Sequence, residues 1–516
     1  MITKRAGIFL TVYLLVVSAA AAATRPNIVM ILADDLGWGD PRCYQAESKI
    51  PTPAMDRLAV EGLRFTDAHT SSSVCTPTRY SLLTGRYAWR TRLKEGVLDG
   101  FDPPLIAADE DTIASLLKRA GYETHCIGKW HLGMQWMDKD GYVVGDRDVA
   151  GGFRSGRDVD FAKSLYGGPV DVGFDHYFGI SASLDMSPYC WIEERRVVDL
   201  PELESPENRD GLYMNQVEGV MSEGFALVDV LPRIAQKTAD VIQAARDGEA
   251  PFFCYVPLTS PHLPVVPTLE ATGKSEAGAY GDFVVATDQA LATILEALDE
   301  SGQTDDTLVI FSSDNGGLFH SWRFRADDDG GKAPKSKRGE ETAKFGHQSN
   351  AHWRGTKADI YEGGHRVPFL VRWPAGAPAG RVVDALVELT DLYATVADLV
   401  GQSGQGTSGM DSFSLLSLIT GETTESPRPF AVHHSLAGLF ALRKGDWKFI
   451  EGRGSGGFTR PRHIPGEERT GQLYHLGEDD QERVNRYGEE SDLVLELRET
   501  LDRVRESGAV AATEGS

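Results

Sequence analysis

A cysteine at the start of a short helical segment is the first residue of this sequence whose position could support chemistry. Cys75 lies two residues before Pro77, which suits the first turn of a helix, and Gly85 supplies a left-handed stop after roughly two turns. Backbone N–H groups and the positive end of the helix dipole favour an anion at a helix start, either a thiolate or a bound oxyanion. Arg79 lies one helical turn further on. Taken alone, this spacing also fits a small cysteine buried in a turn.

Two pairs of oxygen ligands follow two apolar runs. Asp34 and Asp35 follow a β-branched run that begins at Asn27, and Asp314 and Asn315 follow a second such run. If these carboxylates are buried at strand ends, they need a cation or hydrogen bonds to compensate their charge. The competing interpretation is a solvated turn, because Asp is common in turns. These side chains include neither His nor Cys, which favours Ca²⁺ or Mg²⁺ over zinc, and a loose shell completed by substrate favours Ca²⁺.

Basic side chains follow two other strand candidates. The strand expected at 122–127 is followed by Lys129 and His131, which are two positions apart and can therefore point into one pocket. The strand expected at 252–257 is followed by His262. Taken alone, a lysine and a histidine at the spacing of Lys129 and His131 more often are a surface lysine beside a structural histidine.

Helical patterns alternate with these strands. Helices are expected at 53–65, 111–120, 230–245, 282–298 and 389–400. Strands that alternate with helices predict an α/β fold with a large, mainly parallel central sheet flanked by helices on both faces. The polar residues gather at the carboxyl ends of the strands, where α/β sheets build their sites.

The last part of the chain changes character. Short strand candidates separated by Gly and charged turns lie at 430–434, 439–443, 447–451 and 472–476, before a helix at 492–505. This pattern predicts a small C-terminal domain with a four-stranded antiparallel sheet and one helix. We therefore expect a catalytic domain at 24–425 and a C-terminal α+β subdomain at 426–516 that ends in a disordered tail.

Residues 1–23 have the composition of a Sec-type signal peptide. Lys4 and Arg5 precede an apolar core, and a run of alanines ends at Ala23. The apolar core is short for a bilayer span, which disfavours the alternative of an uncleaved anchor, and no later segment is long and apolar enough to span a membrane. We expect a periplasmic or secreted protein that leaves the membrane after signal cleavage.

The net charge limits the possible binding partners, and the cysteines limit the possible disulfides. The net charge of −24 over 516 residues argues against a nucleic-acid partner, although a local basic pocket can still bind a small anion. Apart from Cys75, four cysteines allow three disulfide pairings, and two of them lie in apolar strand-like runs that favour buried free thiols. These four are Cys43, Cys126, Cys190 and Cys254.

Two stretches near the expected site carry no recognisable motif. Residues 173–188, with Asp185, mix aromatic and polar side chains as a pocket wall does. Residues 326–348 are polar and strongly charged, and we expect either a mobile insertion near the mouth of the site or a solvated loop without a role.

The Cys75 segment resembles the signature of the type I sulfatases, the formylglycine-dependent branch of the alkaline phosphatase superfamily. Its Cys, Pro and Arg are followed by the Leu, Thr, Gly, Arg of 83–86. Further stretches match in the order of the family, namely 33–37, 128–133, 259–264, 313–317, 354–357, 362–368, 442–448 and 473–485. The resemblance covers nearly the whole mature chain and implies a large α/β domain with a smaller four-stranded C-terminal domain.

The resemblance also implies a nucleophile and a metal. In this family a maturation enzyme oxidises the cysteine to 3-oxoalanine (Cα-formylglycine), whose hydrate attacks sulfur with one hydroxyl and expels sulfate with the other. Cys75 is thereby identified as the nucleophile. Asp34, Asp35, Asp314 and Asn315 are similar to the ligands of one Ca²⁺.

The remaining roles follow from the same resemblance. Arg79 is similar to the residue that holds the hydrate, and Lys129 and Lys357 to the residues that hold sulfate oxygens. His131 resembles the partner of the formylglycine hydroxyl in sulfate release, and His262 the general acid for the leaving oxygen.

The function implied is hydrolysis of a sulfate monoester, with a sulfated sugar or polysaccharide fragment as the expected substrate. A phosphonate monoester or phosphodiester hydrolase of the same superfamily is the alternative. A non-catalytic carbohydrate-binding relative is disfavoured, because the metal, nucleophile and acid positions are all intact. The leaving group stays open, since residues 151–188 match no substrate-binding motif and the tract before Lys357 is longer and more charged than a minimal family member requires.

Overall fold

The computed structural model describes residues 25–145, 155–320, 337–462 and 470–507. The signal peptide expected at 1–23 and residues 326–336 of the charged tract lie outside the described residues. Within them, no helix combines the length and the hydropathy of a membrane span. The cysteines of the chain are all free thiols, so the expectation of buried free thiols is confirmed at Cys126 and Cys254.

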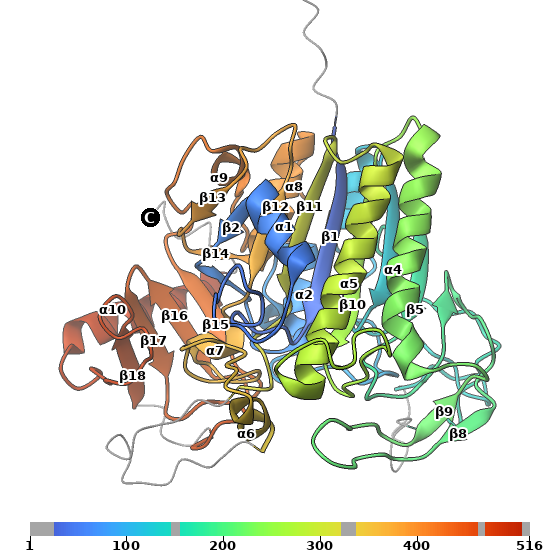
Figure 1. Cartoon of the computed structure of the whole chain (residues 1–516). Helices are drawn as coiled ribbons and strands as arrows, with labels where there is room; N and C mark the ends of the chain where they lie inside the picture. The colour runs from blue at the N-terminus through green and yellow to red at the C-terminus, as the bar shows by residue number, and fades with distance from the viewer. Residues whose placement is uncertain (1–24, 146–154, 321–336, 463–469, 508–516) are drawn as a thin grey trace, which may run out of the picture.

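A ten-stranded sheet forms the centre of the molecule (Figure 1). In spatial order its strands are β13 (Arg381–Val383), β2 (Leu63–Phe65), β12 (Phe369–Arg372), β11 (Thr307–Ser313), β1 (Asn27–Asp34), β10 (Phe252–Pro261), β4 (Glu123–Lys129), β5 (His176–Ile180), β6 (Ile192–Glu193) and β7 (Arg196–Val197). The run from β11 to β5 is parallel throughout, while β12, β6 and β7 pair antiparallel towards the edges. The expected α/β fold with a mainly parallel sheet is confirmed.

Strand β1 shows why both faces of the sheet are covered. Its side chains alternate, so that Ile28, Met30 and Leu32 enter one hydrophobic cluster and the residues between them enter the other. One cluster includes α2 (Cys75–Thr84), α3 (Ile113–Arg119) and α8 (Leu392–Val400). The opposite cluster includes α1 (Pro53–Glu61), α4 (Leu227–Ala244) and α5 (Gly278–Ser301), which lie across the sheet in Figure 1.

The helix expected at 53–65 is wrong in its last part. Helix α1 ends at Glu61, and residues 63–65 form β2 instead. Leu63 and Phe65 are fully buried on one face of the strand while Arg64 between them is half-buried, which is the period of two of a strand. At Gly62 a Cβ atom would lie 2.1 Å from the carbonyl oxygen of Val371, so close packing against β12 ends the helix there.

Smaller elements surround the sheet. Two short ribbons pair β3 (Ala68–His69) with β14 (Val387–Glu388) and β8 (Leu203–Ser205) with β9 (Gly219–Met221). Further short helices are α6 (Lys337–Lys344), α7 (Glu362–His365) and α9 (Leu416–Thr420). Part of the 326–348 tract is therefore helical, and the expected pocket wall at 173–188 contains β5.

The C-terminal sheet follows the expected pattern closely. It contains β15 (Ala431–His434), β16 (Phe440–Lys444), β17 (Trp447–Glu451) and β18 (Gly471–His475), paired antiparallel in that order. Helix α10 (Ser491–Ser507) packs on one face through the side chains of Leu497 and Leu501. Tyr87 and Trp89 of the catalytic part join the same cluster, so the two parts share a core. The boundary at 425/426 stays a prediction.

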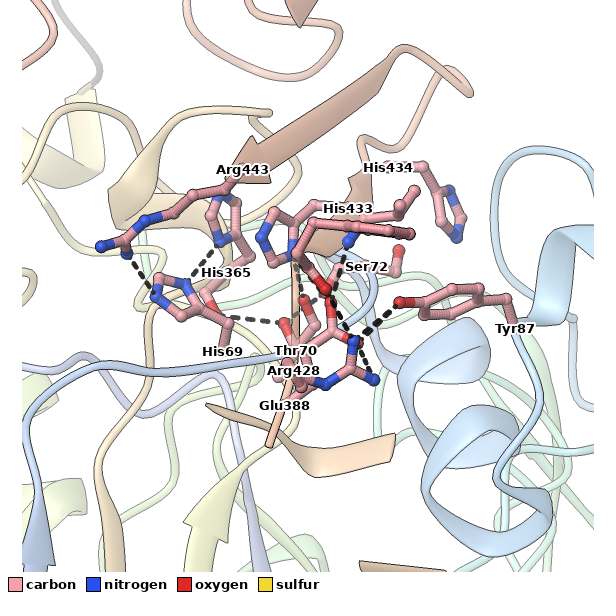
Figure 2. A network of polar contacts seen from close by, with 12 residues as sticks. His69, Thr70, Ser72, Tyr87, His365, Glu388, Arg428, His433, His434 and Arg443 are labelled. Atoms are coloured by element: carbon pink, nitrogen blue, oxygen red, sulfur yellow. Dashed lines mark hydrogen bonds and ion pairs between the residues drawn. The ribbon is translucent and has the colours of Figure 1, made fainter. Parts of the chain in front are cut away.

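Buried histidines join the C-terminal sheet to the central part of the molecule (Figure 2). The Nδ1 atoms of His69 on β3 and His365 on α7 are 3.0 Å apart, and the ring of His365 stacks on that of His433 on β15 at 4.0 Å and 11°. His433 Nδ1 donates to the carbonyl oxygen of Thr70 at 2.9 Å. An ion in the plane of one stacked ring would lie outside the plane of the other, which disfavours a metal site shared by this pair.

The same junction contains buried ion pairs. Arg428 Nη2 lies 2.9 Å from Glu388 Oε2, which also accepts a hydrogen bond of 2.8 Å from the Tyr87 hydroxyl. Arg443 Nη1 donates to Asp67 at 2.7 Å and approaches His69 Nε2 at 3.2 Å (Figure 2). Asp67 Oδ1 also lies 2.8 Å from His69 Nε2, so the charges around this histidine have both signs and burial is the main effect on its pKa. Burial lowers the pKa of His69, His365 and His433.

This depressed pKa makes the stability of the fold sensitive to acid. The unfolded chain binds protons at these histidines below its ordinary pKa of about 6.5, while the folded chain keeps them neutral, so unfolding becomes easier as the pH falls. We expect His433→Gln to remove one such group, so that its free energy of unfolding falls less steeply than that of the wild type between pH 7 and 5, by at most about 1.4 kcal/mol per pH unit. Urea denaturation at each pH measures the slope, with exposed His352→Gln as the control. Equal slopes for His433→Gln and the wild type would contradict this prediction.

Candidate active site

The carboxyl edge of the central sheet brings the predicted acidic residues together. Asp34 ends β1 and Asp35 follows it, and Asp314 and Asn315 follow β11, the neighbouring strand. These four side chains are at most 1% exposed. The backbone N–H of Asp35 donates to Asp314 Oδ1 at 3.2 Å, and Asn315 Nδ2 donates to Asp35 Oδ1 at 2.8 Å. The two pairs, far apart in the sequence, therefore form one cluster of oxygen atoms.

Each carboxylate of this cluster faces a buried cation. Lys129 Nζ, at the end of β4, lies 2.7 Å from Asp34 Oδ2. Lys357 Nζ, in the loop before α7, lies 2.7 Å from Asp35 Oδ1. Arg79 Nη2, on α2, lies 2.7 Å from Asp314 Oδ2. The expected sulfate-binding lysines and the helix arginine thus lie in the same place as the expected metal ligands.

The pKa values of Asp34 and Asp314 are shifted in opposite directions. Burial alone raises the pKa of Asp34, but Lys129, His262 and Arg79 outweigh that effect and hold it well below the usual range. Burial and the neighbouring Asp34 raise the pKa of Asp314. Burial lowers the pKa of Lys357, but Asp35 more than reverses this, so the ammonium stays charged.

Cys75 is the first residue of α2, as the sequence predicts. The helix ends at Gly85, which has a left-handed φ of 64° and donates its N–H to Ser81 O. The Cys75 sulfur lies 3.6 Å from Asp34 Oδ1 and 3.6 Å from Lys357 Nζ. Burial, reinforced by Asp314, raises the pKa of the thiol. Of the two anions considered at this helix start, a bound oxyanion is favoured over a thiolate.

The two predicted histidines are both buried but have different hydrogen-bond partners. His131, with φ of 56°, donates Nε2–H to the carbonyl of Leu98 at 2.7 Å, and its buried Nδ1 has no hydrogen-bond partner among the described residues. Burial and the nearby Lys129 lower the pKa of His131, so its imidazole is neutral. His262 follows β10, donates Nδ1–H to Leu263 O at 2.6 Å, and places Nε2 3.8 Å from Asp35 Oδ2.

Close packing of β4 against β10 sets the positions of Lys129 and His262. A Cβ atom at Gly128 would lie 2.1 Å from the carbonyl oxygen of Pro257, and this glycine has φ of 136°, which disfavours other residues. The adjacent strand ends therefore present an ammonium and an imidazole to the same cluster.

The donor set fits a hard cation. Asn315 Oδ1 is buried and has no hydrogen-bond partner among the described residues, although its amide nitrogen donates twice. Asp34 and Asp35 offer ligand atoms that lie within 4.8 Å of one another and of Cys75 and His262, and Asp314 joins them through its hydrogen bond from the Asp35 N–H. Oxygen atoms from carboxylates and an amide carbonyl are the ligands that Ca²⁺ prefers.

No individual role was predicted from the sequence for Ser183, Asn215 or Arg338. The hydroxyl of Ser183 lies 3.1 Å from His262 Nδ1, and Asp185, expected in the pocket wall, accepts a hydrogen bond of 3.0 Å from Asn215. Arg338 is the second residue of helix α6. Serine and asparagine in loops carry no distinctive sequence signal. The charge of the 326–348 tract was the only sign that could have drawn attention to Arg338.

Comparisons with known proteins agree with this geometry. The sequence profile of the family described as Sulfatase matches residues 26–402. The chain is 32% identical to a curated N-acetylgalactosamine-6-O-sulfatase of Bacteroides thetaiotaomicron, over 93% of each chain, and 29% identical to human steryl-sulfatase, over 84% of this chain and 76% of the relative.

Solved structures give the same result. A structure described under the metabolism of multiple glycosaminoglycans by Bacteroides thetaiotaomicron superposes with a TM-score of 0.78 at 31% identity, over 93% of this chain and 99% of the other. A phosphonate monoester hydrolase of Agrobacterium radiobacter shares the fold alone, with a TM-score of 0.59 at 18% identity over 94% and 96% of the two chains. Since the family profile spans most of the chain and a curated sulfatase is similar along almost its whole length, the chain belongs to the sulfatase family, as a type I sulfatase of the alkaline phosphatase superfamily, and is a sulfuric ester hydrolase.

Proposed function

We propose that this enzyme hydrolyses sulfate monoesters of sugars, releasing inorganic sulfate and an alcohol, with a formylglycine made from Cys75 as nucleophile and one Ca²⁺ as cofactor. The observation that supports this most is the position of Cys75, whose sulfur lies within 3.6 Å of both Asp34 and Lys357 at a helix start. A sulfated sugar is the substrate class we infer, because the relative similar over 93% of each chain is an N-acetylgalactosamine-6-O-sulfatase.

The proposed nucleophile depends on a maturation enzyme that oxidises Cys75. The hydrate of the resulting aldehyde supplies two hydroxyls on one carbon, one for attack on sulfur and one for the release of sulfate. Arg79, one helical turn from Cys75, offsets the negative charge of the hydrate. The buried N–H groups at the start of α2 favour an anion at the same place.

Asp34, Asp35, Asp314 and Asn315 are the residues that would hold Ca²⁺. Bound there, the ion would add positive charge where the substrate sulfate and the nucleophile meet. The carboxylates are now opposed by Lys129, Lys357 and Arg79. Because Ca²⁺ would take part of that role, the two lysines would become available to the sulfate oxygens.

The chain's own cations and imidazoles would carry the proton and charge transfers. Lys129 and Lys357 would stabilise the charge that develops as the S–O bond breaks, in a site from which water is largely excluded. His262 Nε2 would donate a proton to the leaving oxygen, because its Nδ1–H is already bound to Leu263 O. His131 would accept a proton at Nδ1 during sulfate release, because Nε2 carries the proton that binds Leu98 O.

Conversion of Cys75 is the first test of this proposal. We expect the tryptic peptide that contains Cys75, from protein made through its natural secretory route, to weigh about 18 Da less than the unmodified peptide, because CH₂SH is replaced by CHO. Mass spectrometry of intact protein and peptide measures this. Cys75→Ala should lose all detectable sulfatase activity while its melting temperature changes little. Active protein that retains an unmodified thiol would falsify the proposed nucleophile.

Leaving-group dependence tests the role of His262. We expect His262→Ala to slow hydrolysis of a sugar sulfate about 10²–10⁴-fold, because an alkoxide leaves poorly without a proton. An activated aryl sulfate, whose phenolate leaves unaided, should lose much less. Steady-state kcat on both substrates gives the comparison, and His176→Ala, at an exposed histidine, is the control. Equal losses on both substrates would remove His262 from the acid role.

Metal removal tests the proposed Ca²⁺ ligands. We expect dialysis against a chelator to abolish activity and lower the melting temperature, and millimolar Ca²⁺ to restore both, because the ion would offset three buried carboxylates. In Asn315→Ala the concentration of Ca²⁺ that restores the melting temperature should rise at least tenfold. A melting temperature and activity indifferent to the chelator would contradict the metal assignment.

Comparing kcat/KM on aryl sulfate and aryl phosphodiester then separates a sulfatase from a phosphodiesterase.

A further inference from the structure

The segment 208–217 forms one wall beside His262. The backbone N–H of Val265 donates to the carbonyl oxygen of Tyr213 at 2.8 Å, which fastens this segment to the residues that follow His262. Asn215 Nδ2 donates to Asp185 Oδ2 at 3.0 Å, and Asp185 lies two residues after Ser183, the partner of His262 Nδ1. The segment is therefore fixed to both sides of the imidazole proposed to protonate the leaving oxygen.

Helix α6 is fixed to the same wall. The hydroxyl of Thr342 donates to the carbonyl oxygen of Phe319 at 2.6 Å. The ring of Phe319 stacks on Tyr213 at 5.6 Å and on Tyr280 at 4.6 Å. Glu341 also contacts Tyr213, whose pKa burial and this carboxylate raise to about 12. Phe319 follows the Asp314–Asn315 pair closely in the chain. Helix α6 therefore packs against the segment that carries these two residues.

Arg338 extends from α6 onto this wall with its charge largely uncompensated. Its Nε donates to the carbonyl oxygen of Leu212 at 3.0 Å, and the side chain is half-buried. Among the residues that the structure describes, no carboxylate forms an ion pair with it. The fully buried arginines differ in this respect, because Arg79 and Arg428 each lie within 3 Å of a carboxylate oxygen.

The carboxylates that act on Arg338 belong to the active site and its wall. Burial lowers the pKa of the guanidinium, and the charges of Asp35 and Asp185 oppose that effect. Both acids already have closer partners, since Lys357 Nζ lies 2.7 Å from Asp35 and Asn215 binds Asp185. The guanidinium is thus affected by the charges of Asp35 and Asp185, while its Nη groups donate to no described residue.

We propose that Arg338 is a specificity-determining residue that binds a second anionic group, a carboxylate or a further sulfate, on the leaving sugar. This inference rests on the proposed sulfatase chemistry. The scissile sulfate has its own cations in Lys129 and Lys357, whereas Arg338 lies on the wall of His262, where the leaving oxygen departs. A guanidinium binds carboxylate and sulfate groups through two parallel N–H donors, and charge-assisted bonds of this kind are strong.

Four substrates with Arg338→Ala and Arg338→Lys test this role. An aryl sulfate and a monosulfated N-acetylhexosamine carry no second anion, whereas a monosulfated disaccharide with a hexuronate and a disulfated saccharide each carry one. We expect Arg338→Ala to lower kcat/KM about 10–100-fold on at least one of the two doubly anionic substrates, mainly by raising KM. On the aryl sulfate and the monosulfated N-acetylhexosamine the loss should be less than about 3-fold. Arg338→Lys should recover part of the loss. Arg209→Ala, an exposed arginine on the same segment, is the matched control.

The outcomes separate the possible anions. A loss confined to the uronate identifies a carboxylate as the ligand, and a loss confined to the disulfated sugar identifies a sulfate. Equal losses on all four substrates, or no loss on any, would overturn the inference. Failure of the proposed function is distinguishable, because wild-type protein with a converted Cys75 would then not hydrolyse the aryl sulfate at all.

Discussion

Three buried carboxylates that must face three buried cations are the constraint on which this structure depends. Asp34, Asp35 and Asp314 lie at the carboxyl ends of two adjacent strands, and each alone would be costly to remove from water. Lys129, Lys357 and Arg79 offset them from a third strand, a loop and a helix start. The order of the central strands therefore determines whether the charges meet. A displacement of one strand would leave an unpaired charge inside the protein.

Such a cluster is poorly explained as a means of stabilising the fold. Burying ion pairs gains little over apolar packing of the same volume, because desolvation offsets the attraction. Further signs point to a site for a ligand. The amide oxygen of Asn315 and the Nδ1 of His131 are both buried without a described partner, and burial raises the pKa of the Cys75 thiol. A cation would satisfy the amide oxygen of Asn315, and a ligand hydroxyl that donates a hydrogen bond would satisfy His131 Nδ1.

The centre of this site was predictable from the sequence, whereas its rim was not. Apolar runs that end in polar residues place Asp34, Asp314 and Lys129 at one edge of a parallel sheet, since strand direction alone fixes that edge. The strand at 63–65 was missed because its pairing with β12 and β13 is a long-range contact that overrides a local helical pattern. Arg338 depends on how α6 packs against Phe319, which no spacing within the sequence records.

The difference between centre and rim has a functional consequence. Residues proposed to act on sulfur and its oxygens are fixed by strand ends and the start of α2, where a shift would disturb the whole charge cluster. Residues proposed to face the leaving group come from loops and from α6, which contact the centre through Tyr213 and Phe319. Under the proposed function, changes in the rim would therefore alter which alcohol is accepted without disturbing the proposed sulfate site. In a chain with a net charge of −24, a half-buried cation such as Arg338 would also offset the general repulsion of the proposed anionic substrate.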